Sequence, residues 1–331
     1  MRSMDLKTRV ALFTMAIFIC SVWGIAWYEA SNLRAGLQKL LFDQQYARVQ
    51  YIANNIDAAL KARLYALTAV AESITPESIQ QAAKMQTLLT SQKPLGRIFS
   101  LGLYVISADG KGIADFPVMP GRAQADYSKR EYFQDVMKTG KPVIGKPVIG
   151  RFAKEPVLLM AVPIMDKRGK IAGVLVGANK VHGSDLFNEV QVSSSNQNGD
   201  VHIFSVKDRI FIASTDPTRN LKPIAAPGVN KLLDRFLKGF EGSGIMLNSR
   251  GIEALSSASH VVTSGWIVNC FLPTSIAYAP IKSQLNDIFR DAAVISLLMA
   301  FVVGLFIRQQ LAPLRKAANM MNEMAGDQVL P

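Results

Sequence analysis

Cysteine, histidine and acidic residues are scarce in this chain of 331 residues, which holds two cysteines, three histidines and 25 Asp and Glu. Cys20 lies in an uncharged run far from Cys270, so we expect neither a disulfide framework nor a cysteine metal site. The isolated His182, His202 and His260 lack the paired spacing of metal ligands. No P-loop, H-E-x-x-H, G-x-G-x-x-G, Ser/His/Asp or paired-carboxylate pattern stands out. We therefore expect no catalytic residue, metal or cofactor in these residues.

Charged residues are also few, at 19 % of the chain, whereas apolar residues account for 49 %. This balance excludes a disordered chain, which needs low hydrophobicity and high charge. Lys and Arg number 37, which gives a formal net charge of +12. A basic balance suits nucleic acid, anionic lipid or acidic ligands, and the position of the charge decides among them.

Two apolar runs are long enough to cross a bilayer. Residues 10–28 are uncharged and would span about 28 Å as a helix, with Trp23, Trp27 and Tyr28 as an aromatic belt at the far end. Residues 292–307 are also uncharged, and Ile288 and Phe289 extend this second run, which predicts a transmembrane helix at residues 288–307. The alternatives are a cleaved signal peptide for the first run and a buried helix of a soluble protein for the second.

Basic residues flank both runs on what would be the same side of the membrane. They are Arg2, Lys7 and Arg9 before the first run, and Arg308, Arg315 and Lys316 after the second. Because basic residues favour the cytoplasmic side, we expect residues 1–9 and 308–331 in the cytoplasm and residues 29–287 outside, in a periplasm beyond an inner membrane. Membrane lipid is then a partner, and nucleic acid is not expected.

A long helix is predicted from residue 30 to residue 74, where the chain has no proline and one glycine, Gly36. Its apolar stripe follows a spacing of three and four residues, at Ile52, Ile56, Leu60, Leu64, Leu67, Ala71 and Ile74. The helix continues from the first run and ends before Pro76, and residues 78–92 predict a second, short helix. The stripe packs either on a second copy, which favours a homodimer, or on the chain's own sheets.

A strand–turn–strand pattern then occurs in two successive sets. Residues 101–116 and 156–181 form the first set, and residues 200–214 and 252–272 form the second. Each set also has a helical segment between its two hairpins. The sequence therefore predicts an α+β protein with two small units, each with an antiparallel sheet and a central pocket.

Four segments in this order resemble the double Cache family of bacterial transmembrane sensors. They are DYSKREYFQDVMKTGKPVIGKPVIGR (126–151), AVPIMDKRGKIAGVLVG (161–177), STDPTRNLK (214–222) and SGWIVNCFLP (264–273). The resemblance covers about residues 30–290. It implies a stalk helix with two PAS-like Cache units, an outer one at about 95–182 and a membrane-proximal one at about 199–275. It also implies binding of a small molecule outside the cell and a signal passed inward.

The candidate ligand site lies in a basic segment, residues 120–155, which has eight Lys and Arg against four Asp and Glu. A guanidinium next to aromatic rings suits recognition of a carboxylate. The resemblance implies ligand contacts from Tyr127, Arg130, Tyr132 and Phe133. Alternatively, Arg130 forms an ion pair with Asp126 or Glu131, and the aromatic side chains belong to the core.

The next loop departs from the amino-acid-sensing members of that family, which carry an acidic residue there for the ligand's ammonium group. Residues 150–156 instead offer Arg151 and Lys154, with Glu155 as the one acid. We therefore predict an organic anion without an amine, with Arg151 as a further binding residue; the alternative is a structural basic loop without a ligand. The repeat GKPVIGKPVIG (140–150) indicates a sheet edge, either over the pocket or as a solvated connection.

The C-terminal residues 308–331 resemble the start of a HAMP relay module, with a first helix that begins near Pro313 and ends at Gly326-Asp327. This resemblance implies a cytoplasmic output, in a diguanylate cyclase most readily, or in a histidine kinase or chemoreceptor. No motif of such an output occurs in these residues, so the chain is either part of a longer receptor or a short natural product. A structural ectodomain without a small ligand is the remaining alternative.

Overall fold

The computed structural model describes residues 6–183, 185–188, 190, 199–247 and 251–326. The chain divides into two units, residues 1–41 with 277–331, and residues 42–276. Arg2 and Asp327, which the sequence analysis used, lie outside the described residues. The two units are described separately below.

The first unit consists of the start of helix α1 (Leu6–Ser73) and of helix α9 (Ala279–Gly326). Each helix holds an apolar stretch long enough to cross a membrane, and only 6 % of that stretch is buried. Both predicted apolar helices are therefore present, and their side chains are exposed as lipid-facing side chains would be. Helix α9 continues through Pro313, whereas the sequence placed that proline near the start of a separate helix. A proline inside a helix removes one ladder hydrogen bond and its ring crowds the carbonyl four residues earlier, so the helix continues here at a local cost.

The second unit begins with the remainder of α1, which confirms one unbroken helix from the first apolar run to Ser73. Its predicted apolar stripe is buried against the sheets of this chain, except for the half-buried Leu64. This packing accounts for the stripe without a second copy. The homodimer therefore remains a prediction that the stripe no longer supports.

The predicted single helix over residues 78–92 is wrong. The chain forms helices α2 (Pro76–Ile79), α3 (Ala82–Ser91) and α4 (Lys93–Ile98). Thr75 caps α2 by accepting a hydrogen bond from the Ser78 N–H. Gln81 then leaves the helical region, with φ −116° and ψ 89°, so that α3 starts in a new direction.

The outer sheet has six antiparallel strands, in the order β2-β1-β6-β5-β3 with β4 also paired to β5. Helix α5 (Glu131–Thr139) lies between β2 and β3 in the chain. The strands are β1 (Leu103–Ser107), β2 (Gly112–Phe116), β3 (Val143–Ile144), β4 (Val148–Ile149), β5 (Pro156–Met165) and β6 (Ile171–Lys180). Both predicted hairpins are present. The tandem repeat forms the two short strands β3 and β4, which each pair with β5 at the edge of the sheet, as expected for a segment with two prolines.

The Cache unit expected at residues 199–275 is called the inner unit below. Its sheet repeats this arrangement with five antiparallel strands, in the order β8-β7-β11-β10-β9. Helix α7 (Lys231–Leu237) takes the place of α5, and helix α8 (Thr274–Ala277) follows the last strand. The strands are β7 (Asp200–Ser205), β8 (Phe211–Ser214), β9 (Gly242–Leu247), β10 (Glu253–Val261) and β11 (Trp266–Pro273). Short 3₁₀ turns occur at η1 (Asp185–Phe187) and η2 (Pro217–Arg219). The edge strand β9 was not predicted.

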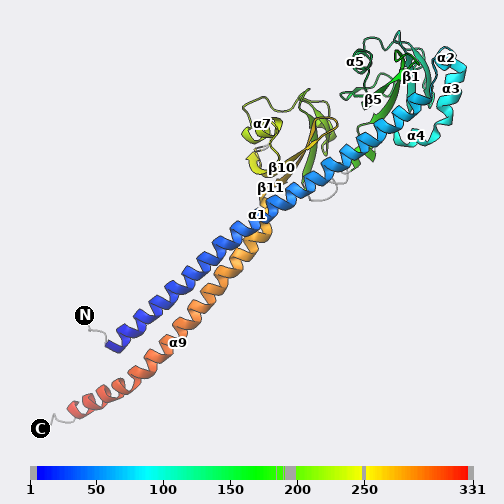
Figure 1. The fold of residues 1–331 in the computed structure, drawn as a ribbon. Coiled ribbons are helices and arrows are strands. Elements are labelled where there is room, and N and C mark those ends of the chain that lie inside the picture. The colour runs from blue at the N-terminus through cyan, green and yellow to red at the C-terminus, as the bar shows by residue number, and fades with distance from the viewer. Residues whose placement is uncertain (1–5, 184, 189, 191–198, 248–250, 327–331) are drawn as a thin grey trace. The chain divides into compact units, whose positions relative to one another are not determined.

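Both sheets use one face to pack on α1, as the course of α1 past the green and yellow strands illustrates (Figure 1). Leu103 and Val105 of β1 lie in the cluster with α1, whereas Tyr104 and Ile106 lie in the cluster with α5. Successive strand residues point to opposite faces, so each strand contributes to two clusters. The predicted α+β architecture of two antiparallel units on a long helix is thus confirmed.

The close contact of Gly177 with Phe99 makes a test of this packing. Gly177 lies in β6 between Leu103 and Met160 of the neighbouring strands, and an alanine Cβ there would overlap the buried Phe99 ring. Because overpacking costs about 1–3 kcal/mol, Gly177→Ala should lower the thermal midpoint of the protein in lipid nanodiscs.

The exposed helical Gly36 provides the control, since nothing lies within 4 Å of a Cβ built there. Gly36→Ala should leave the midpoint unchanged or raise it. Equal midpoints for Gly177→Ala and the unaltered protein would show that the Phe99 ring moves aside at little cost.

Candidate ligand-binding site

The outer unit contains a cavity of about 70 Å³ on the sheet face that is turned away from α1. The sheet supplies its floor, the N-terminal end of α5 one side, and residues 148–153 the cover. Its polar lining consists of three tyrosines and three arginines: Tyr104, Tyr127, Tyr132, Arg122, Arg130 and Arg151. No Asp or Glu is among its lining residues in the described structure.

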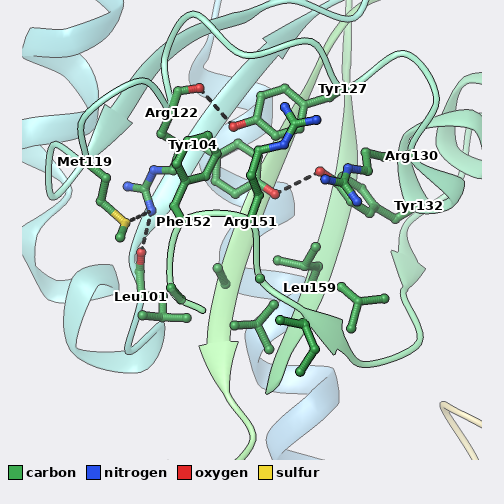
Figure 2. Close-up of a pocket in the computed structure, with 16 residues that line it drawn as sticks. Leu101, Tyr104, Met119, Arg122, Tyr127, Arg130, Tyr132, Arg151, Phe152 and Leu159 are labelled. Carbon is green, nitrogen blue, oxygen red and sulfur yellow. Dashed lines mark hydrogen bonds between the residues drawn. The ribbon is translucent and has the colours of Figure 1, made fainter. Parts of the chain in front are cut away.

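The three tyrosines form one buried cluster (Figure 2). The hydroxyl groups of Tyr104 and Tyr132 are 3.0 Å apart. The rings of Tyr104 and Tyr127 stack with their centroids 5.3 Å apart. The Tyr127 hydroxyl donates to the backbone carbonyl of Arg122 at 2.9 Å. The aromatic floor is therefore fixed by its own contacts, and a ligand would meet a preformed surface.

The segment that carries Tyr127 is tied to the turn between β1 and β2. The Tyr127 N–H donates to the Gly110 carbonyl at 2.8 Å. Gly110 has φ +88°, and a Cβ there would lie 2.7 Å from the Ser128 Cβ. A glycine is therefore required for this close approach of two backbone segments. The turn of the hairpin predicted at residues 101–116 thus helps to position the site.

Arg122 is occupied by structural contacts. Its Nε donates to the buried carboxylate of Asp115 at 2.8 Å, and its Nη atoms donate to the carbonyls of Leu101 and Pro117 at 2.8 and 2.6 Å. Its guanidinium also lies over the Tyr104 ring, 5.5 Å from the centroid. Because its charge is balanced by Asp115, we assign Arg122 to holding the cavity wall.

Arg130 and Arg151 are the two cations at the cavity that form no ion pair in the described residues. Glu131, a predicted alternative partner of Arg130, binds Lys146 at 2.6 Å instead. Asp126, the other alternative, accepts from the Ser128 N–H at 2.8 Å. Arg151 makes one long contact, of 3.5 Å, to the backbone carbonyl of Asp126. Figure 2 shows both arginine side chains among the residues that line the cavity.

Four of the five predicted ligand residues line this one cavity: Tyr127, Arg130, Tyr132 and Arg151. Phe133 does not line it, because α5 turns this side chain into the apolar cluster of the outer unit, where it is 5 % exposed. Sequence reasoning missed Tyr104, Arg122 and Phe152. The alternation of β1 could have identified Tyr104, since Leu103 and Val105 share the opposite face.

Glu155, the one acid of the cover loop, lies away from the cavity. Its carboxylate pairs with Lys180 at 2.9 Å. The loop itself is closed by two backbone hydrogen bonds, from Gly150 to the Glu155 carbonyl and from Lys154 to the Gly150 carbonyl, both 2.9 Å. The cover therefore offers Arg151 to the cavity and no carboxylate.

A family model described as Cache domain matches residues 35–281. The chain belongs to the Cache domain family. This match covers both sheets and the buried part of α1, so the chain is a ligand-binding receptor region and is not itself an enzyme. No curated protein matches the chain.

Solved structures share this fold at low sequence identity. The ligand-binding domain of Mlp24 with asparagine is 19 % identical, with a TM-score of 0.57 over 76 % of this chain and 99 % of that one. The domain of the Pseudomonas fluorescens chemoreceptor CtaA with L-isoleucine is 16 % identical, with a TM-score of 0.58 over 74 % and 98 %. The domain of the Pseudomonas aeruginosa PAO1 chemoreceptor PctB with L-Arg is 20 % identical, with a TM-score of 0.57 over 72 % and 97 %. These likenesses establish the fold alone.

Burial controls the protonation of the tyrosine cluster in this Cache domain. It raises the pKa of Tyr132 to about 12, although the hydrogen bond from Tyr104 and the nearby Arg130 and Arg151 act to lower it. Burial also raises the pKa of Tyr104 and Tyr127. All three hydroxyl groups are therefore neutral donors at physiological pH.

This shift predicts an alkaline loss of stability. A tyrosine whose pKa is higher in the folded state stabilises the fold fully below its unfolded pKa of about 10, and this contribution falls as the pH rises toward 12. Tyr132→Phe should reduce the fall in unfolding free energy above pH 10 by up to about 1.4 kcal/mol per pH unit. Urea unfolding between pH 9 and 11 measures this slope.

Tyr65 provides the control, because its side chain is 77 % exposed on α1. Tyr65→Phe should keep the slope of the unaltered protein. An identical slope in Tyr132→Phe would contradict the assignment of a buried, neutral hydroxyl at position 132.

Proposed function

We propose that this Cache domain is the extracytoplasmic sensor of a two-pass membrane receptor, and that it binds a small organic anion. The ligand lies on the tyrosine cluster, and its carboxylate accepts hydrogen bonds from Arg130 and Arg151. The observation that carries the proposal is the presence of two guanidinium groups without an ion-pair partner at a cavity without a lining carboxylate in the described residues. Arginine suits this role because its planar donors match a carboxylate.

The cavity must enlarge for most ligands. Its volume of about 70 Å³ is less than half of the roughly 150 Å³ that admits benzene in an engineered protein cavity. The cover loop, residues 148–153, forms one wall of the cavity and carries Arg151. After β4 ends, the loop contains no helix or strand. Ligand binding therefore selects an arrangement in which this loop is displaced, which gives the ligand different affinities for two states.

The signal passes to the cytoplasm through the C-terminal helix. Strand β11 ends at Pro273, α8 starts at the next residue, and α9 extends as a helix to Gly326. We propose that residues 308–326 act as the first helix of a HAMP-like relay; their side chains from residue 310 on lie outside the described residues. On the resemblance to a HAMP module we propose a diguanylate cyclase as the output, before a histidine kinase or a chemotaxis signalling domain.

An α-amino acid is the second candidate ligand. It is favoured by the solved structures of similar fold, which hold asparagine, L-isoleucine and L-Arg. An amino acid needs a partner for its ammonium group, and here the cavity offers tyrosine hydroxyls and backbone carbonyls but no lining carboxylate among the described residues. We therefore place the anion first.

Matched ligand pairs decide between the two. Propanoate and succinate should bind the protein in nanodiscs more tightly than L-alanine and L-aspartate, because only the amino acids bring an ammonium group toward Arg130 and Arg151. Isothermal titration calorimetry measures the four dissociation constants. Arg130→Gln and Arg151→Gln should each weaken binding of the acid roughly tenfold or more, the value of one charge-assisted hydrogen bond pair.

Arg168→Gln is the matched control, since Arg168 is an exposed arginine on the turn between β5 and β6. It should leave every constant unchanged. Tighter binding of the amino acids would replace the anion by the second candidate. If neither class bound at about 10 mM, with no change of thermal midpoint, the sensor proposal itself would fail.

The membrane arrangement has its own test. In a protein with Cys20 and Cys270 replaced by serine and alanine, Lys170→Cys places a thiol on the exposed turn between β5 and β6. A membrane-impermeant maleimide should label this thiol in spheroplasts. Gln309→Cys, near the cytoplasmic end of the second apolar run, should be labelled only after lysis. The reverse pattern, or labelling of both in intact spheroplasts, would contradict two crossings with residues 29–287 outside.

A further inference from the structure

The inner unit contains a cavity of about 500 Å³, several times larger than the cavity of the outer unit. It occupies the equivalent place in the repeated fold. Apart from β4, the strands of the two sheets occur in the same order. Helix α5 follows β2 in the chain, and α7 follows β8, which has the same place in the other sheet. Both cavities lie on the sheet face that is turned away from α1. A volume of 500 Å³ falls in the usual range for small-molecule sites, about 300–1,000 Å³.

Apolar and aromatic side chains form most of the wall of this inner cavity. They come from four strands and α7: Phe204, Phe211, Leu233, Met246 and Phe271. Phe204 is 2 % exposed and belongs to the apolar cluster under α7. In the outer unit the tyrosine cluster fills the corresponding space, whereas here no such cluster is among the lining residues. The space can therefore hold the apolar body of a ligand.

The buried polar groups of the wall already have partners. His202 is 5 % exposed, its Nδ1 lies 2.9 Å from the Ser214 hydroxyl, and its ring packs against Phe271 with centroids 5.2 Å apart. The side-chain oxygen Oδ1 of Asn230 caps α7, and its side-chain Nδ2 donates to the Leu247 backbone carbonyl at 3.0 Å. A ligand in this cavity therefore needs few polar groups in its body.

The charged groups of the lining are Lys222, Arg219 and Asp200. Lys222 is held at the rim because its backbone carbonyl accepts from the Phe211 N–H at 2.9 Å, and its ammonium forms no ion pair in the described part of the chain. Arg219 lies over the Phe211 ring at 5.8 Å and 3.7 Å from Asp216. Asp200 accepts from the Thr215 hydroxyl at 3.2 Å. Since Arg219 lies at Asp216, Lys222 is the cation of the lining that has no ion-pair partner in the described residues.

We propose that the inner unit holds a second ligand site, which takes an amphipathic carboxylate with an aromatic or branched apolar body. The body occupies the space between Phe211, Leu233 and Phe271, and the carboxylate binds Lys222 at the rim. The site is separate from the proposed anion site of the outer unit. Phe271 lies on β11, three residues before the start of α8, so an occupant contacts the strand that leads directly into the C-terminal helices.

The experiment uses three probes that share one body and differ in charge: phenylacetate, 2-phenylacetamide and 2-phenylethylamine. Each is titrated into the full chain in nanodiscs by calorimetry, with empty nanodiscs as the blank. Phenylacetate should bind, the amide should bind roughly tenfold more weakly and the amine more weakly still, because only the anion pairs with Lys222.

Two kinds of variant locate the binding. Lys222→Gln should weaken phenylacetate binding roughly tenfold, and Lys231→Gln, the same change at an exposed α7 position outside the cavity lining, should not. Leu233→Trp fills the cavity and should abolish binding. Because Leu233→Trp could also disturb folding, the surface pair Lys222→Gln and Lys231→Gln stands as an independent test.

Arg130→Gln separates this proposal from that of the outer unit, since it should leave phenylacetate binding unchanged. Loss of phenylacetate binding in Arg130→Gln, with full binding in Lys222→Gln, would assign the ligand to the outer cavity and overturn the second site. Amine binding equal to or tighter than that of phenylacetate would overturn the charge assignment. No heat from phenylacetate at about 10 mM would overturn the site for this ligand class.

Discussion

Burial of both faces of each sheet is the constraint on which the rest of this structure depends. One face of each sheet packs on α1, and the other faces a helix, a set of loops and a cavity. Because side chains alternate along a strand, the residue that fixes the sheet to α1 and the residue that lines the cavity are neighbours in the chain. Val105 and Tyr104 show this pairing in β1, and Ile203 and His202 show it in β7.

The same constraint explains which elements could be predicted from the sequence. Strands buried on both faces appear as continuous apolar runs, such as Val157–Ile164, and the stripe of α1 has to match them over its full length. The strand β9 escaped prediction because its first three residues are Gly-Ser-Gly and it forms an edge, where packing demands little. The division between α2 and α3 also escaped prediction, because no proline or glycine marks the change of direction at Gln81.

Residues of the site could be predicted where their place in the sequence determines whether they line the cavity. They could not be predicted where their role depends on contacts that form only on folding. Tyr132 and Phe133 are adjacent on α5 and point about 100° apart around the helix; both belong to the same buried cluster, but only Tyr132 lines the cavity. Arg122 and Arg130 both belong to the basic segment, residues 120–155. Their different roles follow from Asp115 and two carbonyl groups that the fold brings to Arg122 alone.

The difference in volume between the two cavities has an energetic consequence. In the proposed function, the outer cavity of about 70 Å³ takes its ligand with displacement of the cover, and the ligand affinity then includes the cost of that displacement. The inner cavity, of about 500 Å³, admits a ligand without such a change. Both sheets pack on α1, so this helix is the element that connects the two proposed sites. Any coupling between the two proposed sites is reciprocal, so a ligand of the inner unit would shift the affinity of the outer unit by the same factor as the reverse.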